Sequence, residues 1–240
     1  MNLGAYLAAK SKRTLLIDLD PQANATSSLG IDKNRVEVST YDMLIDGTPL
    51  PDLIQLTRRL RLDLAPSAPA LSGAEVELVP IAGREKQLQR ALEGVTEKYD
   101  YILIDCPPAL GLITVNALAA AQGVIVPVQC EYLALEGLTR LMHTISLVRK
   151  SLNPGLIIRG LLMTMYDGRA RLSQQVVDEV RKHFPDRVFN TVIPRSVRLS
   201  EAPSYGEPIL SYAPTSSGGI AYDQLANELL AGDNGTQTKP

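Results

Sequence analysis

The sequence lacks the features of membrane-spanning, secreted and thiolate-metal proteins. Its apolar runs are interrupted well short of the roughly 18 residues that a membrane span needs, and no basic segment followed by an apolar core opens the chain. Only 2 cysteines occur, Cys106 and Cys130, without CxxC spacing and without a histidine nearby. We therefore expect a cytoplasmic protein without a membrane span, and two cysteines that belong to the core.

The composition is that of an ordinary globular protein. Of 240 residues, 45% are hydrophobic and 21% are charged, with 17 Gly and 16 Pro. These values exclude a disordered, collagen-like or coiled-coil chain. Because no internal repeat and no clear domain boundary occurs, we predict one domain over residues 1–231 and a disordered polar tail over residues 232–240.

The net charge of -2 conceals an asymmetry along the chain. Between residues 140 and 200 there are 11 Lys and Arg against 4 Asp and Glu, a local balance of +7. This region could face an anion, or its arginines could simply solvate helix faces. The charge pattern alone leaves both interpretations open.

Short runs of Ile, Leu and Val alternate with segments of helical periodicity. This alternation predicts an α/β fold, a mostly parallel sheet with helices on both faces. Helices are indicated by the apolar spacing within residues 1–10, 88–95, 138–148, 172–182 and 220–230. Strands are expected at 14–18, 60–65, 101–105, 124–128, 156–163 and 188–193.

Aspartates follow two of the predicted strands. Asp18 ends the first strand, Asp20 follows it, and Asp105 ends the strand at 101–105. In open α/β sheets, ligands bind beyond the carboxyl ends of strands, where phosphoryl-transfer enzymes hold Mg²⁺ with such carboxylates. Alternatively, each aspartate caps a helix or fixes a turn.

The usual companion of such a metal site is a glycine-rich phosphate-binding loop of the form GxxxxGK[ST]. No Gly-Lys dipeptide occurs in the 240 residues, and no GxGxxG loop follows a strand. The sequence therefore indicates a metal site without the phosphate-binding loop.

Three runs together resemble the ParA/Soj family of chromosome and plasmid partition ATPases, in the deviant Walker A, MinD-like class of P-loop NTPases. They are LLIDLDPQANATSSLGI at 15–31, YDYILIDCPPALGLITVNAL at 99–118 and VFNTVIPRSVRLSEAPSYGEPILSY at 188–212. The resemblance extends from Met1 to about Leu230, with the motifs in the family's order.

The resemblance implies roles at the nucleotide. Asp20 corresponds to the aspartate that positions the hydrolytic water, and with Pro21 it lies in the nucleotide-binding segment. Asp18 corresponds to its partner near the metal and the phosphates, and Asp105 to the Walker B aspartate. The regions of Thr164 and Pro194 resemble segments that flank the adenine.

The resemblance also implies non-specific DNA binding. Arg195 and Arg198 lie where the family places basic residues that touch DNA. Family members often carry a basic residue near the start of the last helix, where this chain has 217–219, Ser-Gly-Gly. We therefore expect Arg169 and Arg171 to contribute to DNA affinity as well.

The chain departs from the family at its beginning. Family members start with a strand and a KGGxGKT[ST] loop before a helix that reads much like NLGAYLAAK, the run at 2–10. We therefore expect a MinD/ParA-like P-loop fold that lacks its first strand and its P-loop, from a late start assignment or a truncated copy.

Two functions follow as expectations. One is an ATPase of partition, whose ATP- and Mg²⁺-dependent homodimer binds DNA at the nucleoid and is stimulated by a ParB-type partner. The other is a non-enzymatic, truncated paralogue that binds DNA or a partner without binding ATP.

A MinD-like membrane role would need a basic, bulky apolar terminal helix, which the end AGDNGTQTKP does not provide.

Overall fold

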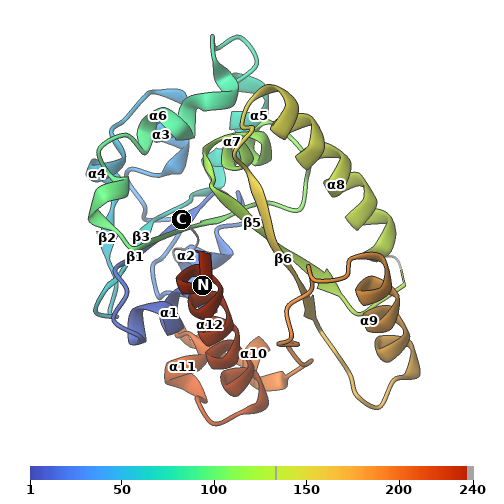
Figure 1. Cartoon of the computed structure of the whole chain (residues 1–240). Coiled ribbons are helices and arrows are strands. Elements are labelled where there is room, and N and C mark those ends of the chain that lie inside the picture. The colour runs from blue at the N-terminus through green and yellow to red at the C-terminus, as the bar shows by residue number, and fades with distance from the viewer. Residues whose placement is uncertain (133, 237–240) are drawn as a thin grey trace.

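The computed structural model describes residues 1–132 and 134–236 and has an α/β architecture (Figure 1). Its strands are β1 (Thr14–Asp18), β2 (Gln55–Leu56), β3 (Leu62–Ala65), β4 (Tyr101–Asp105), β5 (Gly123–Gln129) and β6 (Ile157–Thr164). The helices before β4 are α1 (Asn2–Ala9), α2 (Asn24–Ser27), α3 (Thr40–Ile45), α4 (Leu50–Leu53), α5 (Ala74–Glu77) and α6 (Gln87–Ala91). Those after it are α7 (Leu112–Ala120), α8 (Ala134–Ser151), α9 (Arg171–His183), α10 (Val197–Glu201), α11 (Ile209–Tyr212) and α12 (Ser217–Thr236).

The strands form two sheets instead of the single sheet expected from the sequence. The larger is four-stranded, in the order β2-β3-β1-β4, and the smaller pairs β5 with β6. All pairs are parallel except β2 with β3. In the described residues, β4 pairs only with β1 and β5 only with β6.

Helices cover both faces of the larger sheet, as the sequence predicts. Leu15 and Ile17 of β1 point into a core with α3, α5, α6 and α7. Leu16 points to the opposite face, where it packs with residues of α1 and α2. This alternation follows from the two-residue period of a strand, and it explains why β1 is apolar almost throughout.

A second core surrounds the smaller sheet. Apolar residues of β5 and β6 pack with those of α8 and α9, including Val126, Ile145, Met163 and Val177. Figure 1 shows α8 and α9 on the flank of β5 and β6 that lies away from α3 to α6.

In residues 1–132 and 134–236, no helix is both long and apolar enough to cross a bilayer.

The strand predicted at 188–193 is not formed as a regular strand. Only two isolated bridges occur there, Leu161 with Val188 and Tyr166 with Pro194. The backbone amides of Asn190 and Thr191 donate instead to the Glu228 carboxylate of α12, at 2.7 and 2.9 Å. The Phe189 and Ile193 amides still donate to carbonyls of β6, so Glu228 takes only the two amide donors that lie between them.

Helix α12 extends into the segment that the sequence assigns to a polar tail. Helix α12 continues to Thr236, so residues 232–236 are helical, whereas 237–240 lie outside the described residues. Asp233 accepts a hydrogen bond from the Tyr101 hydroxyl at 2.5 Å and forms an ion pair with Arg159. These contacts with β4 and β6 hold the end of the helix against the body of the protein.

Candidate functional site

The structure brings two of the predicted aspartates together at the carboxyl edge of the larger sheet. In the parallel pairing of β1 with β4, Asp18 lies directly opposite Asp105. The amide of Leu19 then donates to the Asp105 carbonyl at 2.8 Å, which continues the pairing one residue beyond β1. Parallel pairing therefore places both carboxylates where ligands bind in this class of sheet.

Asp18 is fully buried and its carboxylate is occupied by protein donors. It accepts hydrogen bonds from the Thr26 amide and hydroxyl, at 2.8 and 2.7 Å, and from the Asp20 amide at 3.1 Å. Burial raises the pKa of Asp18, while the bonds from Thr26 and Asp20 oppose that rise. These contacts suit Asp18 to hold the loop after β1 rather than to coordinate a metal directly.

Asp20 lies at the start of that loop and is half-buried. Its carboxylate accepts one hydrogen bond, from the Gln22 amide at 2.9 Å, and its carbonyl accepts one from the Ser67 hydroxyl at 2.8 Å. Pro21 follows, and the chain then passes through Ala23 in the left-handed region, at φ 52°, before α2. The Asp20 amide is bonded to Asp18 and its carbonyl to Ser67, so its backbone is held in place. Its carboxylate can still accept a hydrogen bond from a water molecule.

Asp105 is also half-buried, and no hydrogen bond to its carboxylate is found within the described part of the chain. The next residue, Cys106, is partly buried, and the loss of water around its thiol raises the thiol pKa to about 12. The thiol is therefore neutral at physiological pH. Asp105 is the carboxylate at this edge with the most freedom to bind a cation.

Helix α1 begins beside these two aspartates. Burial lowers the pKa of the Met1 amino group, whereas the negative charges of Asp105 and Asp18 raise it. The first backbone amides of a helix have no partner within the helix, and its dipole makes that end positive. The start of α1 therefore offers a position for an anion next to the carboxylates.

The residues fit a magnesium ion that keeps most of its water. No group of three or more His, Cys, Asp or Glu in residues 1–132 and 134–236 could hold a metal by itself. Mg²⁺ commonly takes only one or two carboxylates, together with waters and substrate phosphates. Asp105 and Asp20, whose charges both act on the Cys106 thiol, are consistent with that mode of binding.

Thr164 and Pro194 lie in adjacent segments. Thr164 ends β6, and its carbonyl accepts a hydrogen bond from the Cys130 amide at 2.9 Å. Pro194 pairs in a bridge with Tyr166, whose carbonyl accepts from the Arg195 amide at 2.9 Å. The two segments expected to flank an adenine are therefore neighbours.

The predicted DNA-binding arginines are exposed, but three of them are paired with carboxylates. Arg195 lies 3.2 Å from Glu131, Arg198 lies 2.9 Å from Glu201 and Arg169 lies 3.1 Å from Asp167. Hydrogen bonds from Arg169, and then the charges of Arg169 and Arg195, lower the pKa of Asp167. Arg171 is the first residue of α9. The basic stretch therefore carries less unopposed charge than a count of its residues suggests.

Sequence reasoning missed the residues that support these side chains. Thr26 and Ser67 hold the loop after β1, Thr40 donates to the Asp18 carbonyl at 2.8 Å, and Glu131 pairs with Arg195. Ser67 and Thr40 belong to segments that meet Asp18 and Asp20 only in the folded chain. A candidate signal was available only for Thr26, which lies within the same conspicuous run as Asp18.

A family model described as an AAA domain matches residues 1–158. The chain is 55% identical to the sporulation initiation inhibitor protein Soj of Bacillus subtilis (strain 168) over 231 residues, which are 96% of this chain and 91% of that protein. It is 50% identical to the chromosome partitioning protein ParA of Myxococcus xanthus (strain DK1622), over 97% of this chain and 82% of the relative.

A solved structure has a closely similar fold. It is the cobyrinic acid a,c-diamide synthase from Mycobacterium smegmatis with bound ADP and magnesium, with a TM-score of 0.86 and 36% identity, over 100% of this chain and 90% of that one. The sequence relatives likewise match nearly the whole of this chain, and these comparisons do not show a truncation. With this architecture and these identities, the chain belongs to the ParA/Soj family of partitioning ATPases, which has the α/β P-loop NTPase fold.

Proposed function

We propose that this protein is an ATP hydrolase of chromosome or plasmid partitioning. ATP binding closes a homodimer, the dimer binds DNA non-specifically at the nucleoid, and a ParB-type protein stimulates hydrolysis and release. The observation that carries the proposal is the meeting of Asp18, Asp105 and the start of α1 at one sheet edge. Family membership supports the same conclusion.

The three aspartates divide the work at the nucleotide. Asp105 binds Mg²⁺, directly or through water, because its carboxylate is free of protein donors within the described residues. Asp20 accepts a proton or hydrogen bond from the attacking water and so positions it. Asp18 holds the loop that carries Asp20, through Thr26. When bound, the metal neutralises charge on the phosphates.

The segments of Thr164 and Pro194 form the adenine side of the proposed nucleotide site. Pro21 turns the chain after Asp20 towards α2. The start of α1 supplies backbone amides and the positive end of a dipole to a phosphate group. These residues position and stabilise charge rather than act as nucleophiles, which suits a slow, switch-like hydrolysis.

DNA binding is assigned to Arg195 and Arg198, with Arg169 and Arg171 beside them. Their exposure supports the assignment: the side chains of Arg195 and Arg198 are 58% and 59% accessible. Since such binding is mostly phosphate neutralisation, its affinity falls steeply with salt.

A second candidate function is a DNA- or partner-binding module that does not bind ATP. The sequence observation that favours it is the absence of any Gly-Lys dipeptide, and hence of a GxxxxGK[ST] loop, in the 240 residues. In that case the aspartates would repel a triphosphate unless a cation were present.

Nucleotide binding and turnover by the protein purified from its native source separate the two functions. The partition ATPase predicts saturable ATP binding that requires Mg²⁺, and turnover that DNA and the ParB-type partner increase. An absence of ATP binding by protein that still binds DNA would support the non-enzymatic module. The intact mass of the same sample, compared with 26.0 kDa, establishes which residues the working protein contains.

A further inference from the structure

A cavity of about 340 Å³ lies away from the aspartates, between the turn from β2 to β3 and the segment after α10. Its lining includes Arg58, Arg59, Leu29, Glu207, Pro208 and Ser211. Because β3 begins at Leu62 and runs parallel to β1, this turn lies where the strands begin, at the end opposite Asp18. We infer that the cavity is a binding site for a small, hydroxyl-bearing phosphate ester.

The Nε atom of Arg59 lacks a hydrogen-bond acceptor among the described residues. It is buried and has no hydrogen-bond partner, the one side-chain nitrogen or oxygen of this kind in residues 1–132 and 134–236. A buried donor on a charged group is costly to leave unpaired, and native proteins rarely do so without a reason. Arg59 lines the cavity, so an anionic oxygen bound there would give its guanidinium group an acceptor.

The two arginines that line the cavity are not paired with carboxylates of the residues that the structure describes. Neither Arg58 nor Arg59 forms an ion pair with a carboxylate of the described chain, although many other arginines do. Glu207 is the one acidic residue in the lining, so the cavity has an excess of positive charge. Guanidinium groups match the geometry of phosphate oxygens and can donate two bonds to them.

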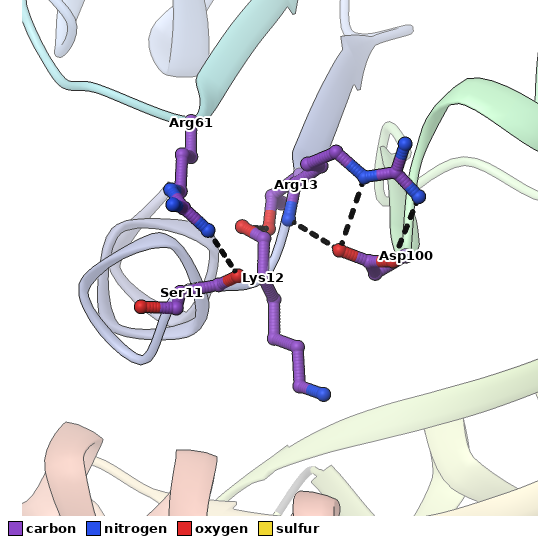
Figure 2. A network of polar contacts seen from close by, with 6 residues as sticks. Ser11, Lys12, Arg13, Arg61 and Asp100 are labelled. Atoms are coloured by element: carbon purple, nitrogen blue, oxygen red, sulfur yellow. Dashed lines mark hydrogen bonds and ion pairs between the residues drawn. The ribbon is translucent and has the colours of Figure 1, made fainter.

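The wall formed by the β2–β3 turn is held in place. The Thr57 hydroxyl donates to the Leu62 carbonyl at 2.6 Å and accepts from the Arg59 amide at 3.1 Å. Just beyond, Arg61 donates from Nη1 to the Ser11 carbonyl at 2.7 Å, as Figure 2 shows. The turn that presents the two lining arginines is therefore tied to the connection between α1 and β1.

The opposite wall is fixed by a close approach of two glycines. Gly206 has φ +65°, and a Cβ atom there would lie 2.7 Å from the Cα atom of Gly30, so a larger residue would not fit. Further along, the Ile209 amide donates to Asn2 Oδ1 at 2.9 Å. Walls that are already ordered reduce the entropy lost when a ligand binds.

The rest of the lining indicates the class of ligand. Glu207 can accept from a hydroxyl group, Ser211 can donate or accept, and Leu29 and Pro208 provide apolar surface. The volume lies at the lower end of the range of small-molecule sites, about 300–1,000 Å³. The arginines can bind a phosphate group, and Glu207 can accept a hydrogen bond from a hydroxyl group. The lining therefore favours a sugar phosphate over a bare anion.

The test is a titration of the full chain, labelled with ¹⁵N, with ribose 5-phosphate at constant ionic strength. We expect the Arg59 Nε–H signal to shift and to saturate. Arg59→Lys, which keeps the charge, and Arg58→Lys, at an exposed position, should each weaken binding at least tenfold. Arg35→Lys is the matched control, because Arg35 is 87% exposed and outside the cavity, and it should bind as the parent does.

Three results would overturn the inference. If sodium chloride alone shifted the Arg59 Nε–H signal as much as ribose 5-phosphate does, the shift would reflect general ionic screening and not binding. Equal affinity for inorganic phosphate and ribose 5-phosphate would show that the site binds phosphate alone and does not recognise the sugar. A response to a short DNA duplex without a response to ribose 5-phosphate would make the arginines part of a nucleic-acid surface. Thermal unfolding of each variant shows that loss of binding is not loss of fold.

Discussion

Asp18 shows how one buried carboxylate can organise the loop that bears the proposed catalytic residue. Folding removes it from water, and the amide and hydroxyl of Thr26 then supply two of its three hydrogen bonds. The same hydroxyl accepts from the Ser67 amide at 3.0 Å. Thr26 therefore joins three segments through a single oxygen atom.

Replacing this hydroxyl by a methyl group tests that role. Thr26→Val keeps the side-chain shape but leaves Asp18 and the Ser67 amide each short of a partner, which should cost about 1–3 kcal/mol of unfolding free energy. Urea unfolding measures the change. The control is Thr144→Val, whose exposed hydroxyl bonds only within α8, and it should change stability by less than about 0.5 kcal/mol. An equal loss of stability in the two variants would contradict the role of the Thr26 hydroxyl in holding Asp18 and Ser67.

Under the proposed function, Glu131 competes with DNA for Arg195. Neutralising it with Glu131→Gln frees the guanidinium 3.2 Å away, so DNA should bind more tightly. Arg195→Gln should weaken binding and reduce the slope of log K against log salt by about 1. Fluorescence anisotropy with a DNA duplex over a salt series measures both. Unchanged affinity in both variants would place the DNA elsewhere.

At the scale of elements, the starts of β1 and β4 are joined by Arg13 and Asp100 (Figure 2). The Asp100 carboxylate accepts from the Arg13 amide at 2.7 Å and from its guanidinium at 3.0 and 3.3 Å. These bonds lower the pKa of Asp100 from 3.8 to about 2. The pair lies at the start of the same five-residue register that places Asp18 opposite Asp105 at the other end.

This shift predicts a pH dependence. A carboxyl whose pKa is lowered by folding stabilises the folded state above its unfolded pKa, and that contribution is lost as pH falls through about 2. Asp100→Asn should therefore be less stable than the parent at pH 7, and the difference should shrink between pH 4 and 2. Urea unfolding at several pH values measures it. A difference that is independent of pH would contradict the ion pair.

Glu228 holds the middle of the segment at 188–193, between the backbone bonds of Phe189 and Ile193 to β6. Glu228→Gln leaves one acceptor oxygen where two now serve the Asn190 and Thr191 amides, which should cost about 1–3 kcal/mol. Hydrogen exchange at the Thr191 amide should also accelerate. The matched control is Glu97→Gln in the exposed 3₁₀ helix at Thr96–Lys98, which should leave both properties unchanged.

Hydrophobic periodicity predicted most elements, and long-range polar contacts explain the errors. The strands at 14–18 and 101–105 are confirmed with their bounds, and the other strand regions except 188–193 are confirmed within a few residues. Their apolar runs identify them, although only β1 is buried at every residue, whereas β4 is half-buried throughout. The contacts of Glu228 and Asp233 could not be predicted, since each joins residues far apart in the chain. The short helices within 24–53 lack a clear periodic stripe.

At the scale of the whole molecule, the aspartates, the start of α1 and the arginines form two groups on one α/β body. The sequence predicted which aspartates end strands, and the pairing of β1 with β4 places Asp18 and Asp105 together. Net charge gave less information: the excess of cations between 140 and 200 is partly cancelled by carboxylates from outside that stretch, such as Glu131 and Glu201. Composition along a chain does not reveal such pairing.

The most direct test of the proposed ATPase is Mg²⁺-dependent ATP turnover by the natively produced protein and its Asp20→Ala variant. Asp20 contacts the reacting water in this account, so the variant should still bind ATP but hydrolyse it about 10²–10⁴-fold more slowly. Turnover that is unchanged in the variant, or a parent protein that binds no ATP in the presence of Mg²⁺, would contradict the account.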